Sequence, residues 1–492
     1  MNSELKIRSD LDVLVRAASP EVDDLLDLAF RRYPDDESGS FAWFGWRETP
    51  GGIVLTLASI ETPRSGDLDD TVPNICFLPP SIRRAVKAAQ EGRLAAAVVH
   101  SHPAECHTGA SIIDDDMDTY FADLFAGYTP DRPYVSLIFA HNASGQLSGT
   151  GRIFWRGEWH AVRRFAVERK SVYLEGYSSS VRLSAHAAER IARLRSAFGE
   201  ESASRLAGAT VAVIGASGTG SPAIEALARA GVGHLIIVDP DVFAASNLER
   251  VHGSWDADVG TAIPKAEIAR RHIQAINPDC QVTAILGALP QPEVIDAVAT
   301  ANVVLGCTDQ HYSRVALSDL AVRYLVPVID CGVQLEGGGG NVTAQVVQLV
   351  RLLPADPCVY CQDMVSNQRV QQELMSPAER AQRMTAAEQA AERGEAGDAY
   401  WQELPQLNTV GYLTTTAGAM AAGYAIGWIT GRFDPPFLRL QMDLGAPLFG
   451  VVDARKQPRA ECACRRARGT ADQGGVDAFI WPAAHWSPAV IL

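Results

Sequence analysis

The sequence predicts an α/β protein, and the stretch between residues 209 and 309 carries this prediction. An apolar strand beginning at Thr210 runs into a glycine turn, and a helix and a second apolar strand, which ends in Asp239, follow. The turn contains three glycines: Gly215, Gly218 and Gly220. Strand, glycine turn, helix and strand within about 30 residues are typical of a Rossmann-like, doubly wound nucleotide-binding unit.

The glycine turn is suited to holding phosphate, because glycines let backbone amides approach the oxygens and the next helix presents a partial positive charge. Asp239 stands where an acidic group can bind a ribose hydroxyl. Ser217 replaces the second glycine of the usual G-x-G-x-x-G pattern, so the turn alone is a weak signal. The residues after the turn therefore decide the interpretation.

Polar residues in a fixed order follow the turn. They are Asp239 and Asp241, then Ser246, Asn247, Leu248 and Arg250, then Gly260 and Lys265, and finally Thr308 and Asp309 after another apolar strand. This series resembles the adenylating domain of ubiquitin-activating enzymes and of the ThiF-type sulfur-carrier adenylyltransferases of thiamine and molybdopterin biosynthesis. A hydride-transferring dehydrogenase would show the glycines without these residues. The resemblance, from near Arg190 to Cys464, implies an adenylating domain at 206–465 with a crossover segment at 362–412.

The resemblance also implies which side chains bind ATP besides the glycine turn: Asp239, Asn247, Arg250, Lys265 and, across a subunit boundary, Arg190. In this assignment Arg250 and Lys265 neutralise phosphate charge and Asp309 holds Mg²⁺, and these three are the catalytic candidates. A turn or cap is the alternative for Asn247, and exposed solubilising charge is the alternative for the two cations.

The implied reaction is the activation of a carboxylate. A C-terminal carboxylate oxygen attacks the α-phosphorus of ATP in line, and the products are an acyl-adenylate and pyrophosphate. The implied substrate is a ubiquitin-like or sulfur-carrier protein that ends in glycine. Such a site must supply cations and fixed donors for the charge that develops on phosphoryl oxygens.

The length and composition of the chain narrow the classes of protein to which it can belong. A chain of 492 residues is long enough for two or three domains. The net charge of −15 argues against a basic surface for nucleic acid. No run of about 18 apolar residues occurs, and the N-terminus lacks the apolar region of a signal peptide. We therefore expect no membrane contact and a cytoplasmic location.

Residues 1–165 predict a second α/β domain. Apolar alternation predicts strands around Phe41 and Ile53, with helices before and after them. A further apolar run leads into His100 and His102. Because residues at i and i+2 of a strand project from one face, both imidazoles can reach a single metal ion.

Five residues of this domain resemble the motif of the JAB/MPN metalloproteases, which remove ubiquitin-like proteins. They are Glu37, His100, His102, Ser111 and Asp114. The resemblance implies a catalytic zinc held by His100, His102 and Asp114. It also implies that Glu37 accepts a proton from water and that Ser111 steadies an oxyanion.

The spacer between Pro103 and Ser111 is one residue longer than the family pattern, and it contains Glu105, Cys106 and His107. Active hydrolysis and a retained but silent fold therefore both stay open. The acidic residues after the motif are expected to form a solvated helix start: Asp115, Asp116 and Asp118.

Residues 166–205 are predicted to contain a linker and the first helix of the adenylating domain. Arg190 and Arg193 match an Arg-x-x-Arg that precedes the first strand in the adenylating family. The resemblance implies a homodimer in which Arg190 reaches the ATP phosphates of the partner. A solvated basic helix face is the alternative.

Four of the nine cysteines form two tight pairs: Cys358 with Cys361, and Cys462 with Cys464. Four thiolates at short spacings suit a tetrahedral structural zinc in a reducing compartment. Related adenylyltransferases carry such a zinc, although their second pair is usually Cys-x-x-Cys. The other cysteines are expected to be small buried side chains: Cys76, Cys106, Cys280, Cys307 and Cys331.

The crossover segment contains no cysteine, although ubiquitin-activating enzymes place their thioester-forming cysteine in or after it. Three routes stay open. The protein stops at the adenylate, a conjugating-enzyme partner supplies the cysteine, or a hydroxyl of Ser366 or Thr409 forms an oxyester. Residues 366–400 are polar and are expected to form an exposed helix or a mobile flap.

The small apolar residues from Leu413 to Trp428 predict a helix packed closely on the sheet, and the tail at 466–492 is assigned no role. The two resemblances together favour an ATP-dependent activator of a ubiquitin-like protein in a bacterial-type conjugation system. The JAB-like domain would mature, remove or dock the modifier. Activation of a sulfur carrier for cofactor synthesis and a non-catalytic, modifier-binding scaffold are the alternatives.

Overall fold

The computed structural model describes residues 5–104, 108–142, 144–174, 181–396, 401, 409–445, 450–453, 456, 459–475 and 488–492. Glu105, Cys106 and His107 of the motif spacer lie outside the described residues. The chain divides into two compact units. The N-terminal unit comprises residues 1–179, 321–325 and 463–478, and the C-terminal unit comprises residues 180–320, 326–462 and 479–492.

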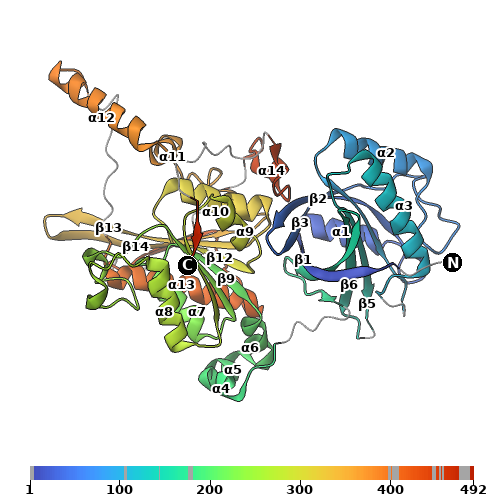
Figure 1. Ribbon diagram of the computed structural model, residues 1–492, viewed down its shortest axis with the longest axis horizontal. Coiled ribbons are helices and arrows are strands. Elements are labelled where there is room, and N and C mark those ends of the chain that lie inside the picture. Colours follow the sequence, from blue (N-terminus) through green and yellow to red (C-terminus); the bar gives the residue numbers. More distant parts are fainter. Residues whose placement is uncertain are drawn as a thin grey trace. The chain divides into compact units, whose positions relative to one another are not determined.

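The N-terminal unit is built on an eight-stranded sheet in the order β5-β4-β2-β3-β1-β7-β6-β8, in which β5 also pairs with β6. The strands are β1 (Ile7–Ala17), β2 (Gly39–Thr49), β3 (Gly52–Ile60), β4 (Ala95–Ser101), β5 (Tyr134–His141), β6 (Leu147–Trp155), β7 (Glu158–Val167) and β8 (Tyr173–Leu174). The helices are α1 (Glu21–Ala29), α2 (Pro79–Glu91), α3 (Ile112–Tyr128) and α14 (Cys464–Ala467). Helix α1 packs on one face of the sheet, and α2 and α3 pack on the other (Figure 1).

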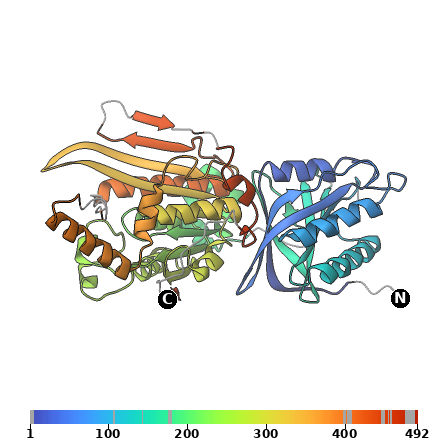
Figure 2. The same cartoon turned by 90° about the horizontal axis from the view of Figure 1, so that it is seen from above.

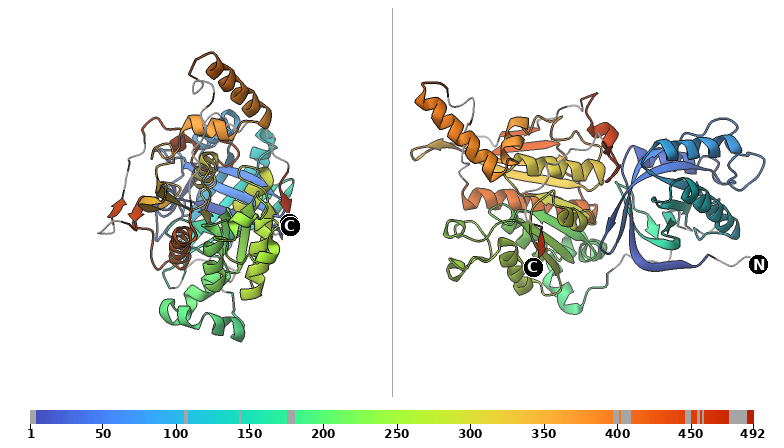
Figure 3. Two further views of the ribbon diagram at one scale, coloured as in Figure 1. Left: turned by 90° about the vertical axis from the view of Figure 1, so that its left-hand side faces the viewer. Right: turned by 45° about the horizontal axis from the view of Figure 1, so that its top comes forward.

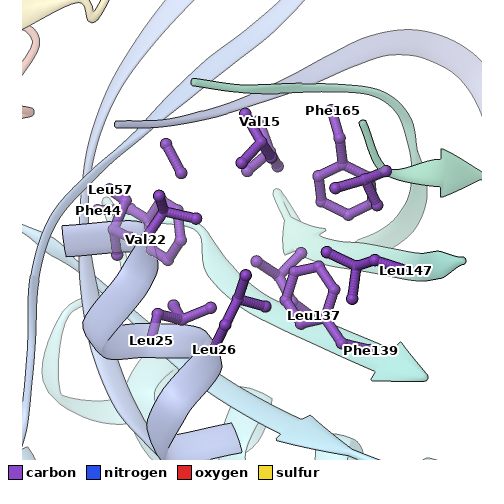
Figure 4. Close-up of a pocket in the computed structure, with 13 residues that line it drawn as sticks. Val15, Val22, Leu25, Leu26, Phe44, Leu57, Leu137, Phe139, Leu147 and Phe165 are labelled. Atoms are coloured by element: carbon purple, nitrogen blue, oxygen red, sulfur yellow. The ribbon is translucent and has the colours of Figure 1, made fainter. Parts of the chain in front are cut away.

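A small cavity lies between α1 and the sheet (Figure 4). It is lined only by apolar side chains, among them Val22, Leu25, Phe44 and Leu137, and its volume is about 10 Å³. A space of that size is at the lower limit for one water, which would also need polar partners. The cavity is therefore a dry packing gap in the core rather than a ligand site.

The acidic start of α3 is not solvated as expected. Asp118 is fully buried, and its Oδ2 accepts a hydrogen bond from Arg152 Nε at 2.6 Å. The same arginine also bonds Asp115, whereas Asp116 is exposed. The prediction is wrong for Asp115 and Asp118, because β6 brings a buried guanidinium against them and a buried charge needs a partner.

Part of the C-terminal tail belongs to the N-terminal unit. The carbonyl oxygen of Gly469 accepts hydrogen bonds from Gly45 N at 3.1 Å and from Thr56 Oγ1 at 2.7 Å. Ala471 forms a β-bridge with Trp46 beside these bonds. The tail thus satisfies a backbone amide of β2 and a side-chain hydroxyl of β3, which its basic and glycine-rich sequence did not indicate.

The C-terminal unit contains a nine-stranded sheet in the order β16-β15-β14-β13-β12-β9-β10-β11-β17. The strands are β9 (Thr210–Ile214), β10 (His234–Asp239), β11 (Gln281–Leu286), β12 (Val303–Gly306), β13 (Val328–Gly338), β14 (Asn341–Leu352), β15 (Arg439–Asp443), β16 (Gly450–Asp453) and β17 (Val490–Ile491). Strands β13, β12, β9, β10 and β11 are parallel. Strands β14 to β16 extend the sheet with antiparallel pairings, and the long β13 and β14 lie beside β15 and β16 (Figure 2). The predicted α/β class with a Rossmann-like unit is confirmed.

The helices of this unit are α4 (Ala185–Arg190), α5 (Ala192–Phe198), α6 (Glu200–Ala207), α7 (Gly220–Arg229), α8 (Lys265–Ile276), α9 (Pro292–Val298), α10 (His311–Arg323), α11 (Asn367–Glu373), α12 (Pro377–Glu392) and α13 (Gly411–Thr430). Helix α13 joins the main core because its small residues allow close packing on the sheet. Helix α12, of which only Ala390 is buried, stands away from the rest of the unit (Figure 3). None of the helices described combines the length and the apolar character needed to cross a bilayer.

The remaining cysteines divide by environment. Cys280, Cys307 and Cys331 are buried, as expected for small apolar side chains. Cys76 is exposed, so the expectation is wrong there, because the chain at this position runs over the surface between β3 and α2. Cys106 lies outside the described residues.

Candidate functional site

The glycine turn lies where the strand order of the parallel sheet reverses. Strand β9 pairs in parallel with β12 on one side and with β10 on the other. Gly215 has a φ of +95°, and a Cβ on it would lie 2.5 Å from the carbonyl oxygen of Cys307. A Cβ on Gly220 would lie 1.8 Å from the carbonyl oxygen of Gly215. Both positions therefore require glycine, and the turn occupies the place where open α/β sheets bind ligands.

Asp239, at the end of β10, holds this turn in place. Its Oδ2 accepts a hydrogen bond from Ala216 N at 2.7 Å, and its Oδ1 accepts one from Asp241 N at 2.9 Å. Burial raises the pKa of this carboxyl, whereas the charge of Lys265 and the two amides act in the opposite direction. Asp239 thus stabilises the glycine turn by accepting a hydrogen bond from its backbone.

Lys265 is the first residue of α8 and is only 6% exposed. Its Nζ lies 2.7 Å from Asp241 Oδ2, and its backbone amide donates to the Asp241 carbonyl at 3.0 Å. The alternative that Lys265 is an exposed solubilising charge is therefore wrong. The Lys265 ammonium lies at the carboxyl edge of the sheet and pairs with Asp241, so a phosphate that takes the place of the Asp241 carboxylate can bind it.

The loop after β10 places Asn247 and Arg250 differently. Asn247 is buried, and its Oδ1 accepts a hydrogen bond from Ala244 N at 3.0 Å, so it closes a turn. Arg250 lies on the glycine turn, since a Cβ on Gly218 would be 3.0 Å from Arg250 Cδ. The absence of a side chain at Gly218 lets the arginine approach the turn that would carry phosphate.

Asp309 is exposed just beyond β12, at the same edge as Lys265. Tyr312, in the first turn of α10, connects the two positions electrostatically. Burial raises the pKa of Tyr312 to about 12, and the carboxylates of Glu373, Asp241 and Asp309 add to this shift. Asp309 follows β12 and Asp241, which pairs with Lys265, follows β10, so both carboxylates lie beyond the carboxyl ends of parallel strands.

Arg314 and Asp330 were missed by sequence reasoning. Arg314 Nε lies 3.2 Å from Asp330 Oδ2, and Asp330 stands opposite Gly306, the last residue of β12. Burial raises the pKa of Asp330 to about 6, and Arg314 opposes this shift. Asp330 Oδ1 is buried without a hydrogen-bond partner among the described residues. An acidic residue inside an apolar strand was the signal that could have identified the pair.

Helix α13 covers the glycine turn. A Cβ on Gly418 would lie 2.2 Å from the Thr219 carbonyl oxygen, so helix and turn are in close contact. At the start of the helix, Glu249 Oε1 accepts a hydrogen bond from Gly411 N at 2.6 Å. Gly411 lies near the end of the predicted crossover segment, and a carboxylate at a helix N-terminus stabilises its first turn. The N-terminus of α13 is thus held by Glu249, the residue before Arg250.

Ser366, one of the two hydroxyl candidates, is engaged in local structure. Its Oγ accepts a hydrogen bond from Arg369 N at 3.4 Å and caps α11, and its amide donates to His311 Nδ1 at 3.1 Å. The ring nitrogen nearest to Ser366 therefore already serves the amide rather than the hydroxyl. Thr409 is half-buried just before α13. Among the residues that the structure describes, the contacts of Ser366 therefore include no base that would activate its hydroxyl for an oxyester.

Arg190 lies at the opposite edge of the sheet from the glycine turn. Its Nη2 donates to Asn277 Oδ1 at 2.9 Å and pairs with Asp279, just before β11 begins. Arg190 therefore does not reach the glycine turn of its own chain. Its contact with ATP bound to a second copy stays a prediction.

The four paired cysteines come together. Ligand atoms of Cys358, Cys361, Cys462 and Cys464 all lie within 4.8 Å of one another, and the sulfurs of Cys358 and Cys462 are 3.6 Å apart. Four thiolates around zinc, with Zn–S bonds of about 2.3 Å, place their sulfurs roughly 3.8 Å apart. The donor set and its spacing therefore fit a structural zinc.

A second metal-ligand cluster lies in the N-terminal unit at the end of β4. His100 Nε2 is 3.1 Å from Asp114 Oδ1, and His102 Nε2 is 3.3 Å from Asp114 Oδ2. All three side chains are buried, and His100 Nδ1 has no hydrogen-bond partner among the described residues. Burial alone would raise the pKa of Asp114, but the bonds from His100 and His102 bring it well below its usual range.

Glu37 and Ser111 flank this cluster. Glu37 Oε1 lies 3.9 Å from His102 Nε2, while its Oε2 accepts a hydrogen bond from Ile75 N at 2.8 Å. Ser111 caps α3, because its Oγ accepts a hydrogen bond from Asp114 N at 3.2 Å. The five residues quoted for the motif thus meet in one place, and two nitrogens and a carboxylate oxygen can hold a zinc ion.

Residues 189–465, more than half of the chain, match the ThiF family. The SAMP-activating enzyme E1 of Haloferax volcanii is 36% identical over 164 residues, which are 33% of this chain and 56% of the relative. The sulfur carrier protein ThiS adenylyltransferase of Escherichia coli is 36% identical over 134 residues, which are 27% of this chain and 53% of the relative. The chain thus spans about half the length of these curated relatives.

A third relative, the adenylyltransferase and sulfurtransferase UBA4 of Eremothecium gossypii, is 32% identical over 157 residues. That match covers 32% of this chain and 33% of the relative. Among solved structures, E. coli MccB with ATP is similar at 18% identity and a TM-score of 0.41, over 55% of this chain and 72% of that chain. This structural likeness is too weak to carry an argument about function.

Proposed function

Because the chain belongs to the ThiF family, we propose that it uses ATP to adenylate the C-terminal carboxylate of a ubiquitin-like or sulfur-carrier protein. One observation carries the proposal. The glycine turn, Arg250, Lys265 and Asp309 all follow the carboxyl ends of neighbouring parallel strands. Hydrogen-bond donors for phosphate oxygens, two cations and a carboxylate for a metal are the groups that this reaction needs.

The proposed chemistry assigns each group a task. The backbone of the glycine turn and the N-terminus of α7 bind phosphate oxygens. Arg250 and Lys265 neutralise the charge that develops as the carboxylate oxygen attacks the α-phosphorus and the bond to pyrophosphate breaks. Asp309 would hold Mg²⁺, which neutralises phosphate charge and aligns the leaving group.

The named relatives support both kinds of substrate. One is described as an activating enzyme for SAMP, and the others as adenylyltransferases, one of them for the sulfur carrier ThiS. We favour a ubiquitin-like modifier in a bacterial-type conjugation system, with sulfur-carrier activation as the second candidate. A requirement for a sulfurtransferase would favour the second, because a thiocarboxylate needs a sulfur donor.

The test is ATP–pyrophosphate exchange by the full chain with a small protein whose C-terminus is glycine. Exchange that appears only with this protein supports adenylation, and the same protein with its terminal carboxylate amidated is the matched control. Binding of the small protein with no exchange at any ATP concentration would instead support the alternative that the chain is a non-catalytic, modifier-binding scaffold. The homodimer and the Arg190 contact are tested by mixing Arg190→Ala chains with chains that carry Asp309→Ala, since a shared site regains activity in mixed dimers.

The step after the adenylate is proposed to use a thiol from another protein. Ser366 caps a helix, and Cys307 and Cys331 are buried with their sulfurs 3.5 Å apart. The hydrogen bond with Cys307 and burial raise the pKa of Cys331, so this thiol is a poor nucleophile. Mass spectrometry of the chain after reaction with modifier and ATP distinguishes the routes, because a stable adduct on this chain would contradict the proposal.

We further propose that the N-terminal unit binds zinc and hydrolyses the modifier from precursors or conjugates. The specific observation is the buried cluster of His100, His102 and Asp114 with Glu37 beside it. Zinc held there supplies Lewis-acid activation, Glu37 can accept a proton, and Ser111 stands at the start of α3 for an oxyanion. Cleavage of a modifier fused to a C-terminal extension tests this activity, and metal binding without cleavage would support the silent fold.

A further inference from the structure

The last residues of the chain form the outermost strand of the nucleotide-binding sheet. Strand β17 runs antiparallel to β11, with Ile491 opposite Ile285 and Val490 opposite Leu286. The Leu492 amide donates to the Ala284 carbonyl oxygen at 2.9 Å. The strand thus satisfies backbone groups at an edge of the sheet that would otherwise be open.

A glycine directly after β11 leaves space for the residues that lead into β17. A Cβ on Gly287 would lie only 2.6 Å from Ala489 Cβ, so a larger residue would displace the tail. Gly287 also donates its amide to the Asp239 carbonyl oxygen at 3.3 Å. The tail therefore contacts the residue next to the aspartate expected at the ribose.

The strand order gives the direction of a bound nucleotide. Phosphates at the turn after β9 and a ribose near Asp239 after β10 point the base toward the end of β11. Because β17 is antiparallel to β11, the residues before Val490 continue past this same edge. These residues are the exposed Pro488 and the half-buried Ala489.

We propose that Pro488 and Ala489 form a wall of the base end of the ATP site, which extends the adenylating function proposed above. The tail is held mainly by its backbone, since the side chains of Val490 and Ile491 are 52% and 67% exposed. Its removal therefore leaves the core of the sheet intact. The wall contacts the apolar face of the base and excludes water from it.

The experiment measures ATP binding to the full chain by calorimetry for four proteins. They are the natural chain, a chain that ends at residue 487, Leu492→Pro and Leu492→Ala. The truncation removes the wall, and proline removes the amide that bonds Ala284, so both should raise the Kd for ATP about fivefold or more. Alanine keeps the backbone donor and should bind ATP like the natural chain.

Ligand fragments give the second readout. The truncation should weaken adenosine 5′-monophosphate by the same factor as ATP and leave inorganic tripolyphosphate unchanged, because the tail lies at the base end. Unchanged ATP binding by the truncated chain would overturn the inference, as would equal weakening of tripolyphosphate. A natural chain that binds no ATP would instead overturn the proposed adenylation, so the two failures are distinguishable.

Discussion

Lys265 Nζ lies 2.7 Å from Asp241 Oδ2, and this ion pair holds the ammonium at the edge of the sheet where nucleotide phosphates are proposed to bind. The side chain of Asp241 is 64% exposed whereas that of Lys265 is 8% exposed, so the carboxylate can turn to solvent while the cation stays in place. A phosphate can therefore replace the aspartate without any movement of helix α8. The pair keeps a buried cation neutralised until substrate arrives.

Replacing Lys265 with Met should keep most of the buried volume and remove the charge. We expect kcat/KM for ATP–pyrophosphate exchange to fall about 100-fold or more, since a charge that stabilises the transition state is lost. Lys87→Met, on the exposed surface of α2, is the matched control. Exchange at the natural rate in Lys265→Met would contradict the phosphate role.

Asp309→Ala should abolish pyrophosphate exchange while the melting temperature stays the same. Asp309 is exposed, so its removal leaves no unpaired group in the core, but the proposed Mg²⁺ loses a ligand. The check is exchange measured across a series of Mg²⁺ concentrations, with the exposed Asp434→Ala as control. Normal exchange by Asp309→Ala at low Mg²⁺ would refute the metal role.

Cys361→Ser should lower the zinc content of the full chain by one ion and reduce its stability. The four thiols come from two segments that are distant in the sequence, and a zinc bound by them contributes to the free energy of folding. Elemental analysis and thermal unfolding measure the two effects, and the exposed Cys76→Ser is the control. An unchanged zinc content would exclude this site.

His102→Ala should remove a second zinc ion without affecting adenylation. The ligand set of His100, His102 and Asp114 lies in the N-terminal unit, whereas the proposed adenylating residues lie in the C-terminal unit. Zinc content and pyrophosphate exchange are measured on the same preparation, with the exposed His186→Ala as control. Equal zinc in both variants would mean that the cluster is not a metal site.

Glu225 should make folding sensitive to acid. Burial opposes its ionisation, but hydrogen bonds from His252, Arg229 and His272 outweigh burial and lower its pKa to about 2. A lowered carboxyl pKa contributes stability above the ordinary value near 4.5, and this contribution is lost as the pH falls from 4.5 toward 2.

The variant Glu225→Gln should therefore be less stable at pH 7, by about 1 kcal/mol after solvent screening. Its stability should also depend less on pH in the acid range. Urea unfolding at a series of pH values from 7 into the acid range measures the free energy of unfolding and its dependence on pH. The exposed Glu293→Gln is the control. Parallel pH profiles for Glu225→Gln and the natural chain would contradict the assignment.

Short-range patterns predicted the elements that depend on local physics. The glycines at 215 and 220 could be identified because a tight strand-to-helix turn excludes side chains, and the structure shows the clash that a Cβ would cause. The buried α13 followed from its run of small apolar residues. Spacing in the chain also brought the cysteine pairs and the His-x-His pair into consideration as ligands.

Partners that come from distant strands could not be predicted in this way. The buried pairing of Asp118 with Arg152 joins α3 to β6, and the pairing of Arg314 with Asp330 joins α10 to β13. Arg190 shows the same limit, since its helix position gave no indication that Asn277 and Asp279 would be its partners. Such contacts depend on how the sheet is ordered, and residue types along the chain do not encode that order locally.

The sequence by itself determined the α/β class, the glycine turn and the family of the C-terminal unit, because these depend on strand periodicity, backbone freedom and the order of polar residues. Only the tertiary structure decided which charges meet at the carboxyl edge and that the chain's last residues close the sheet beside β11. The physical reason is that these contacts join separate elements of the fold, 24 residues apart for Asp241 and Lys265 and about 200 residues apart for β11 and β17. Their energy depends on distance in space rather than along the chain.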